Sequence, residues 1–267
     1  MKDADFNELV QTLNGLSVER PNKVGSGTLS GHAAGEPFEK LIYHILKKKF
    51  PSEVFKQFEY LNDLYRANPH NISVEDRKAL FDSPTALFLL SRGDNATREW
   101  SPENIFEEKQ DDTADILCRE GKVFDIIDVK TRNMSKTAMP PNIISAYKLA
   151  QACAIMIDNE DYESINIHYI EVEWFEENNV LTCLEAHWRD LFRSTPESLY
   201  INWAAAMQVQ FHVSLLNQSF TGTREQWARE YLRVFVNSAE RRCKRMYETY
   251  VIPFKKYITE ENSLFSE

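Results

Sequence analysis

The segment that most constrains the fold of this chain is a hairpin pattern centred on Gly121 and Lys122. The chain reads ADILCRE before this turn and VFDIIDVKT after it, so β-forming residues dominate both sides. The apolar run SPTALFLLSRG predicts a short helix that ends near Gly93. Apolar residues at helical spacing predict further helices over residues 4–17, 37–50, 54–67, 74–81 and 224–250. Helices alternating with strands predict an α/β protein with a mixed central β-sheet flanked by α-helices.

Two further segments complete this prediction. Asn142 follows two prolines and offers an N-cap, so we expect a helix whose apolar residues run from Ile143 to Ile157. The run SINIHYIEVEWF reads as another strand. Half of the chain's eight glycines lie in GSGTLSGHAAGEP, which predicts a flexible or closely approaching segment. No repeat or linker divides the chain, so we expect a single domain over residues 1–267.

Charge is distributed unevenly along the chain, although the net charge is −10. Residues 149–188 contain nine acidic residues and no Lys or Arg, whereas residues 224–256 contain nine basic and four acidic residues. A smaller basic cluster, Lys130, Arg132 and Lys136, begins within the strand that follows the turn. One face of the protein could therefore attract a polyanion such as DNA, or these segments are ordinary solvated helix faces.

The cysteines and histidines show no spacing typical of a metal site. Cys118, Cys153, Cys183 and Cys243 are widely separated, which makes a zinc site improbable, and we interpret them as small apolar side chains. No apolar run approaches the roughly 20 residues that cross a bilayer. The first residues also lack the basic start and apolar middle of a signal peptide. We therefore expect a cytoplasmic protein that does not bind a membrane.

An acid and a lysine two positions apart, Asp128 and Lys130, interrupt the second strand of the hairpin. Because side chains alternate between the two faces of a strand, both residues point to the same face and Asp125 points to the other. An acid-x-Lys triplet occurs four times in the chain. The other three begin at Asp76, Glu107 and Glu120, in a polar helix, in a charged run and at the hairpin turn. Only the triplet of Asp128 and Lys130 lies on a strongly predicted strand.

Asp115 opens the first strand of the hairpin, thirteen positions before Asp128, so the hairpin can bring the two carboxylates together. Adjacent carboxylates repel each other unless a cation or a proton lies between them, and oxygen ligands favour Mg2+. Lys130 would then orient or deprotonate a water molecule, or stabilise charge on a phosphoryl oxygen. This arrangement is typical of metal-dependent phosphodiester hydrolysis. A salt-bridged hairpin without catalytic function is the alternative. The acid-x-Lys triplet alone favours this alternative, but Asp115 at hairpin distance and the basic cluster downstream make the two interpretations nearly even.

Six longer segments carry a further signal. In chain order they read SGTLSGHAAGEPFEKL, SPTALFLLSRG, DTADIL, DVKTRN, PNIISAYKLAQ and LYINWAAAMQVQFHV. Together they resemble the HincII family of type II restriction endonucleases, which are PD-(D/E)xK nucleases. The resemblance extends from about residue 20 to residue 257, so it covers nearly the whole chain. Ala114 stands where the superfamily motif has proline, a departure that is tolerated because proline is not a metal ligand.

The resemblance implies a restriction-endonuclease-like fold and a homodimer wrapped around duplex DNA. It implies Mg2+-dependent cleavage with blunt ends within the palindrome GTYRAC, or within a relaxed GTNNAC variant. Asp115, Asp128 and Lys130 match the catalytic positions, and the main-chain carbonyl of Val129 matches a further metal ligand. A cognate DNA methyltransferase is implied as well, although not in a stable complex.

The same resemblance implies which residues contact DNA. Asn142 and Asn202 match positions near base edges, and the DNA-contacting set also includes Ser30, Met139 and Pro140. Where the family has Gln-Ala-Pro-Asn, this chain has Met-Pro-Pro-Asn, so an apolar side chain replaces a polar one that is pressed between bases. The change concerns the two central base pairs more than the outer ones, because central bases are recognised largely through deformability.

Two other functions fit part of these observations. A DNA-binding protein of the same fold that has lost catalysis would keep the basic C-terminal helix, but Asp115, Asp128 and Lys130 are all present. A metal-dependent hydrolase of small phosphoesters would need those three residues, but neither the basic helix nor the resemblance. A type II restriction endonuclease accounts for all of them.

Overall fold

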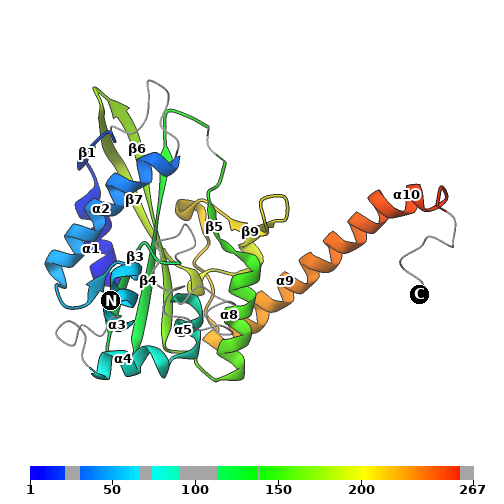
Figure 1. Cartoon of the computed structure of the whole chain (residues 1–267). Coiled ribbons are helices and arrows are strands. Elements are labelled where there is room, and N and C mark those ends of the chain that lie inside the picture. Colours follow the sequence, from blue (N-terminus) through cyan, green and yellow to red (C-terminus); the bar gives the residue numbers. More distant parts are fainter. Residues whose placement is uncertain (22–30, 66–73, 91–112, 138, 259–267) are drawn as a thin grey trace.

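The computed structural model describes residues 1–21, 31–65, 74–90, 113–137 and 139–258. Its centre is a six-stranded sheet with the strand order β1-β7-β6-β4-β3-β2 (Figure 1). Strands β4 and β6 run parallel, and the other neighbouring pairs are antiparallel, which confirms the predicted mixed sheet. The six strands are β1 (Ser17–Glu19), β2 (Val54–Phe55), β3 (Ile116–Glu120), β4 (Val123–Asn133), β6 (Ile165–Glu177) and β7 (Val180–Asp190).

Helices cover both faces of this sheet. Helices α1 (Asp3–Leu13) and α2 (Gly31–Lys49) pack on one face, and α5 (Pro84–Leu90) and α8 (Ala146–Asp158) pack on the other. Three short helical turns lie at Leu191–Arg193, Pro196–Ser198 and Val213–Leu215. The described residues also form helices α3 (Gln57–Tyr65), α4 (Val74–Phe81), α9 (Arg224–Met246) and α10 (Ile252–Lys255).

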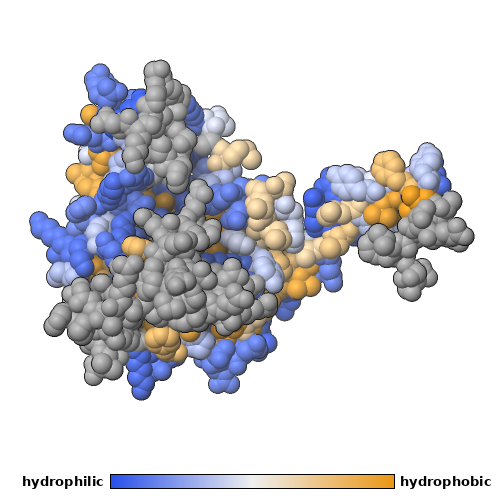
Figure 2. Space-filling view, viewed as in Figure 1, coloured by the Kyte–Doolittle hydropathy of each residue, from blue (hydrophilic) through white to orange (hydrophobic). Residues whose placement is uncertain are grey.

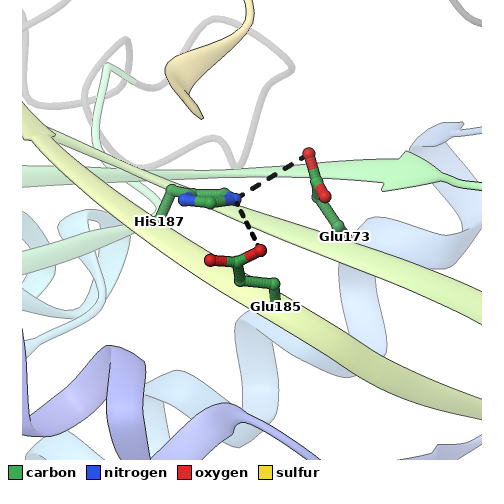
Figure 3. A group of neighbouring side chains, drawn as sticks. All are labelled: Glu173, Glu185 and His187. Carbon is green, nitrogen blue, oxygen red and sulfur yellow. Dashed lines mark ion pairs between the residues drawn. The ribbon is translucent and has the colours of Figure 1, made fainter. Parts of the chain in front are cut away.

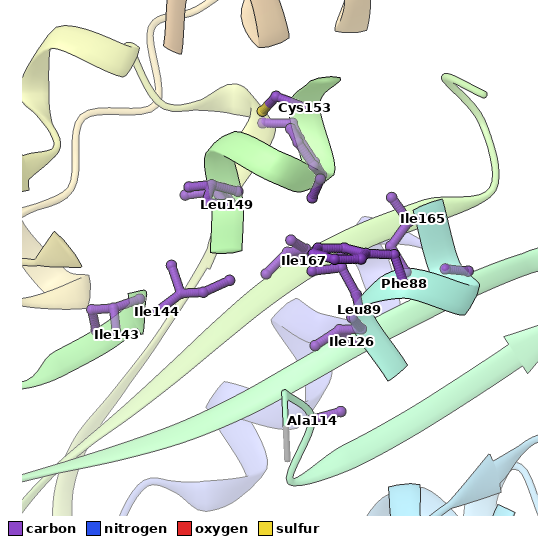
Figure 4. Packing of buried hydrophobic residues seen from close by; sticks show 14 of the residues in the cluster. Phe88, Leu89, Ala114, Ile126, Ile143, Ile144, Leu149, Cys153, Ile165 and Ile167 are labelled. Atoms are coloured by element: carbon purple, nitrogen blue, oxygen red, sulfur yellow. The ribbon is translucent and has the colours of Figure 1, made fainter. Parts of the chain in front are cut away.

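The two faces of β4 show why the chain forms this layered structure. Phe124 and Ile126 point to the face covered by α5 and α8, whereas Ile127 and Val129 point to the face covered by α1 and α2. Figure 4 shows the first of these cores, where Ile126 lies near residues of β6 and α5. Because β4 is apolar on both faces, it can only be a central strand.

A second, three-stranded sheet lies beside α8. Its antiparallel order is β5-β9-β8, with β5 (Asn142–Ser145), β8 (Tyr200–Asn202) and β9 (Gln208–Gln210). The predicted helix start at Asn142 is therefore wrong. Asn142 begins a strand, and Ser145 caps α8 by accepting a hydrogen bond from the Lys148 amide at 3.3 Å. Pairing with β9, which is distant in sequence, overrides the local capping signal.

Three other boundaries differ from the sequence prediction. Val54 and Phe55 pair with β3 as strand β2, so the helix expected from residue 54 begins at Gln57. Helix α2 begins at Gly31, inside the glycine-rich segment. Helix α1 ends at Leu13, before the predicted residue 17. The predicted end of α5 near Gly93 lies outside the described residues.

The predicted basic helix over residues 224–250 forms a long arm. Thr223 and Gln226 make a reciprocal capping box at its start, with N–H to oxygen distances of 3.2 Å and 2.8 Å. A π-helical turn, Tyr247–Val251, joins α9 to α10, and the arm projects away from the rest of the protein (Figure 1). Apolar residues gather on its distal part (Figure 2). In the described ranges, no helix has the length and apolarity of a membrane span.

Candidate active site

The register of the β3–β4 hairpin determines where the predicted catalytic residues lie. Ile116 pairs with Ile127, so the next position outward places Asp115 opposite Asp128. The two carboxyl groups lie close enough for the charge of Asp128 to raise the pKa of Asp115. Lys130 reaches back along β4, and its Nζ atom lies 2.8 Å from an Asp128 oxygen. The structure thus brings Asp115, Asp128 and Lys130 together on one face of the sheet.

The hydrogen-bond ladder between β3 and β4 ends beside Asp115 and Asp128. Its end leaves the main-chain groups of Val129 without a main-chain partner on β3. In a continued ladder Val129 would pair with Ala114. Instead, the Val129 N–H donates to Asp115 Oδ2 at 2.7 Å, and the Ala114 N–H donates to Gln57 Oε1 at 2.8 Å. The N–H and C=O of one strand residue point to the same side, so the Val129 carbonyl also faces Asp115.

The protonation of this group follows from burial and from the paired charges. Burial, and then the nearby charge of Asp128, raise the pKa of Asp115 to about 7. Burial alone would lower the pKa of Lys130, but the charges of Asp128 and Asp115 outweigh it and raise that pKa. The site therefore holds an ammonium group beside two carboxyl groups that compete for a cation or a proton.

Several residues that the sequence reasoning missed hold Asp115 in place. The buried Gln57 donates to the Leu90 carbonyl at 2.8 Å while it accepts from Ala114. Lys148 of α8 donates to the Thr113 hydroxyl at 2.6 Å. Both contacts fix the segment that leads into β3. No sequence signal identified them, because each pairs residues that are distant in the chain.

A third carboxyl group lies near the pair. Burial, and then the charge of Asp115, raise the pKa of Glu39 on α2, and Lys56 forms an ion pair with this residue. The charge of Glu39 also acts on Lys130. Helix α2 therefore places a further carboxyl group near the site, and Lys56 offsets its charge.

Asp125 has a different environment, as its position in the strand predicts. It is buried on the opposite face of β4, where it accepts hydrogen bonds from Asn166 at 2.9 Å and from the Met1 amine. His168 Nε2 lies 3.1 Å from the same carboxylate. Burial would raise the pKa of Asp125, but these partners lower it. Asp125 thus belongs to the packing of α1 against the sheet, outside the catalytic group.

The predicted DNA-contacting residues lie along the connection from β4 to the second sheet. Met139 is 82% exposed, and Pro140 next to it is half-buried. Asn142 begins β5 and Asn202 ends β8. Gln210 of β9, which the sequence reasoning missed, hydrogen-bonds to both asparagines. Ser30 lies outside the described residues.

A separate charged group lies across β6 and β7, where Glu173, Glu185 and His187 direct one ligand atom each to a common region (Figure 3). His187 Nε2 is 3.8 Å from Glu173 and 3.9 Å from Glu185. Arg132 donates to the same Glu173 oxygen at 3.2 Å. Arg132 therefore already pairs with one of the two carboxylates of this group. The sequence prediction that the histidines show no metal-ligand spacing was based on residues close together in the chain. It therefore missed this arrangement, in which the ligand atoms come from two neighbouring strands.

Comparisons of the sequence with known proteins agree on one family. The family model described as restriction endonuclease HincII matches residues 9–258. Type II restriction enzyme HindII of Haemophilus influenzae is 56% identical over 253 residues, which cover 95% of this chain and 97% of that protein. Type II restriction enzyme HincII, also of Haemophilus influenzae, is 55% identical with the same coverage. Among solved structures, NlaIV restriction endonuclease matches 91% of this chain and 90% of its own, at 8% identity and a TM-score of 0.38.

Proposed function

The chain belongs to the HincII family of type II restriction endonucleases, and on this premise we propose that it hydrolyses both strands of duplex DNA within a short palindrome, using Mg2+. The observation that carries the proposal is the pairing of Asp115 with Asp128 at the open end of the β3–β4 ladder, with Lys130 beside them. Site-specific cleavage of DNA is the reaction for which the relatives are named.

The chemistry of the donor set fits Mg2+. Asp115, Asp128 and the Val129 carbonyl supply three oxygen atoms, and hard divalent cations prefer such ligands. The raised pKa of Asp115 supports this fit, because a bound cation would replace the shared proton. When bound, Mg2+ supplies Lewis acidity and lowers the pKa of a coordinated water molecule. The chain's own residues hold the phosphodiester in a single orientation beside the site.

Lys130 acts in this proposal as an ammonium group. In the metal-free protein, the charges of Asp128 and Asp115 raise the pKa of Lys130, which favours the charged form that donates hydrogen bonds. From its place beside Asp128 it orients the attacking water and stabilises charge on the nonbridging phosphoryl oxygens. Lys130 lies two residues after Asp128 on the same face of β4, and this spacing keeps its Nζ atom within hydrogen-bonding distance of the Asp128 carboxylate.

The recognition site that we propose is GTYRAC, or a relaxed GTNNAC variant, with blunt-ended products. Asn142 and Asn202 contact the outer base pairs, and Ser30 contributes to DNA binding. Met139 and Pro140 press against the central step, and the high exposure of Met139 supports this role. A cognate methyltransferase protects the host's own sites without forming a stable complex, and the enzyme works in the cytoplasm, where that DNA lies.

A palindromic site calls for a two-fold symmetric enzyme, so we propose a homodimer in which each subunit cuts one strand. The apolar distal part of the arm supports this proposal. Its exposed large side chains are Met246, Tyr247, Tyr250, Val251, Ile252, Phe254, Tyr257 and Ile258. A contiguous exposed apolar patch of this kind is typical of a protein interface. We propose a second copy of the chain as the partner that covers it.

Digestion of a plasmid of known sequence tests the function. We expect discrete fragments with Mg2+ and intact plasmid with EDTA, and sequencing of the fragment ends should show blunt cuts at GTYRAC or GTNNAC. Sequence-specific binding without cleavage would instead indicate the inactive DNA-binding protein. A single-domain organisation over residues 1–267 stays a prediction, which limited proteolysis would examine.

A further inference from the structure

Gln210 links the two asparagines that we assign to base recognition, through side chains that share one face of the second sheet. Gln210 is the last residue of the central strand β9, directly opposite Asn142 of β5. Asn202 of β8 pairs with Gln208, two positions earlier, so it lies diagonally across from Gln210. Diagonal neighbours of this kind remain within reach of long side chains.

The main chain determines how the Asn202 amide is oriented. Its Oδ1 atom accepts hydrogen bonds from the N–H groups of Ala204 and Ala205, at 3.0 Å and 3.3 Å. A backbone N–H can only donate, so the oxygen of Asn202 must face the loop and its nitrogen must face away. The loop itself is tightly held, since Ala206 and Met207 both adopt left-handed conformations, with φ of 51° and 56°.

This orientation passes from Asn202 to Gln210 and then to Asn142. Asn202 Nδ2 donates to Gln210 Oε1 at 2.9 Å, which turns the Gln210 nitrogen toward β5. Gln210 Nε2 then donates to Asn142 Oδ1 at 2.7 Å. An amide nitrogen cannot accept a hydrogen bond, so reversing any one of the three amides would break the chain of contacts.

We propose that Gln210 is a positioning residue that sets the hydrogen-bonding polarity of both asparagines toward DNA, an inference that rests on their proposed role at base edges. Asn202 is left as a donor only, because its oxygen is already used twice. Paired recognition of adenine requires an amide that donates to N7 and accepts from N6. Asn202 is therefore restricted to acceptor edges such as guanine N7 and O6. Asn142 keeps both of its N–H groups and one oxygen lone pair, so it can still recognise adenine.

Two substitutions of Gln210 separate this role from a merely structural one. Gln210→Leu removes both contacts, and we expect discrimination at both outer base pairs to fall about tenfold or more, as kcat/KM ratios on matched and outer-substituted duplexes. Gln210→Glu keeps an oxygen that accepts from Asn202, but it replaces the N–H group that donates to Asn142 with a second oxygen acceptor. Discrimination should then persist at one outer pair, the one with guanine acceptors, and fall at the other.

The control is Gln208→Leu, on the same face of β9, which should preserve both discrimination ratios. Thermal melting of all three variants checks that they fold. Unchanged ratios in Gln210→Leu would overturn the inference, and so would an equal loss at both pairs in Gln210→Glu. If Gln210→Leu fails to fold, the asymmetric result of Gln210→Glu decides alone. Failure of the unmodified enzyme to cut any palindrome would instead refute the proposed function, before any variant is compared.

Discussion

At the residue scale, a substitution of Lys130 tests its proposed catalytic role separately from DNA binding. Lys130→Ala removes the ammonium group but leaves Asp115, Asp128 and the surfaces that hold DNA. We expect binding to duplex DNA to stay within a few-fold of the unmodified enzyme, while single-turnover cleavage falls by several orders of magnitude. Gel-shift titration with Ca2+ and rapid-quench kinetics with Mg2+ measure the two quantities. Cleavage within about tenfold of the unmodified rate would remove Lys130 from the mechanism.

The paired carboxyl groups predict a pH dependence of stability in the metal-free protein. The folded state holds the Asp115 proton up to about pH 7, whereas the unfolded chain releases it near its ordinary pKa of 3.8. Stability should therefore fall as pH rises through this window. Urea unfolding in EDTA at pH 5 and pH 8 measures this change. The decrease should be smaller in Asp115→Asn, and equal decreases in both proteins would contradict the assignment.

Much of this site could be predicted at the residue scale, because strand periodicity and hairpin length are local properties. They place Asp128 and Lys130 on one face, Asp125 on the other and Asp115 within reach. Gln57 and Gln210 could not be predicted in this way. Gln57 contacts Leu90 and Ala114, and Gln210 contacts Asn142, so both join segments that are distant in sequence. No spacing rule encodes such contacts.

At the scale of secondary-structure elements, the start of α8 shows how a nonlocal contact changes a local signal. Asn142 is a residue type that commonly caps helices, but Ile143 and Ile144 are buried in β5, where Ile144 pairs with Val209 of β9. The cap moves to Ser145. Ser145→Ala should lower the free energy of unfolding by about 1 kcal/mol, as loss of an N-cap does. Asn142→Ala should leave that free energy nearly unchanged. Chemical denaturation of both variants measures these free energies. A larger loss of stability in Asn142→Ala than in Ser145→Ala would indicate that the helix begins at Asn142.

The connection between β4 and β5 carries the second prediction at this scale. Met139→Ala shortens the exposed apolar side chain that we place at the central DNA step. Unstacking costs least at pyrimidine–purine steps, so the variant should change the preference among central dinucleotides. The requirement for the outer GT and AC should stay intact. Cleavage of duplexes that vary central and outer pairs separately provides the measurement, and an unchanged central preference would show that Met139 does not enter the stack.

At the scale of the whole molecule, the arm formed by α9 and α10 predicts the oligomeric state. Light scattering should give about twice the 31.2 kDa chain mass. Phe254→Asp places a charge in the exposed apolar part of the arm, where we expect it to shift the protein toward monomer. Glu240→Gln, at an exposed polar position of α9, serves as the control and should remain dimeric. A monomer of the unmodified protein at micromolar concentration, with and without DNA, would exclude the homodimer.

The pairing of β1 with β7 has a consequence for how the enzyme is made. Ser17 pairs with Thr182, so one edge of the central sheet joins residues 165 positions apart. The catalytic strand β4 likewise needs β6 as its parallel neighbour. During synthesis neither contact exists until most of the polypeptide has left the ribosome, and contacts of such long range form slowly. A nascent chain thus carries Asp115, Asp128 and Lys130 without the sheet that aligns them, so on the proposed function we expect no nuclease activity until translation is nearly complete.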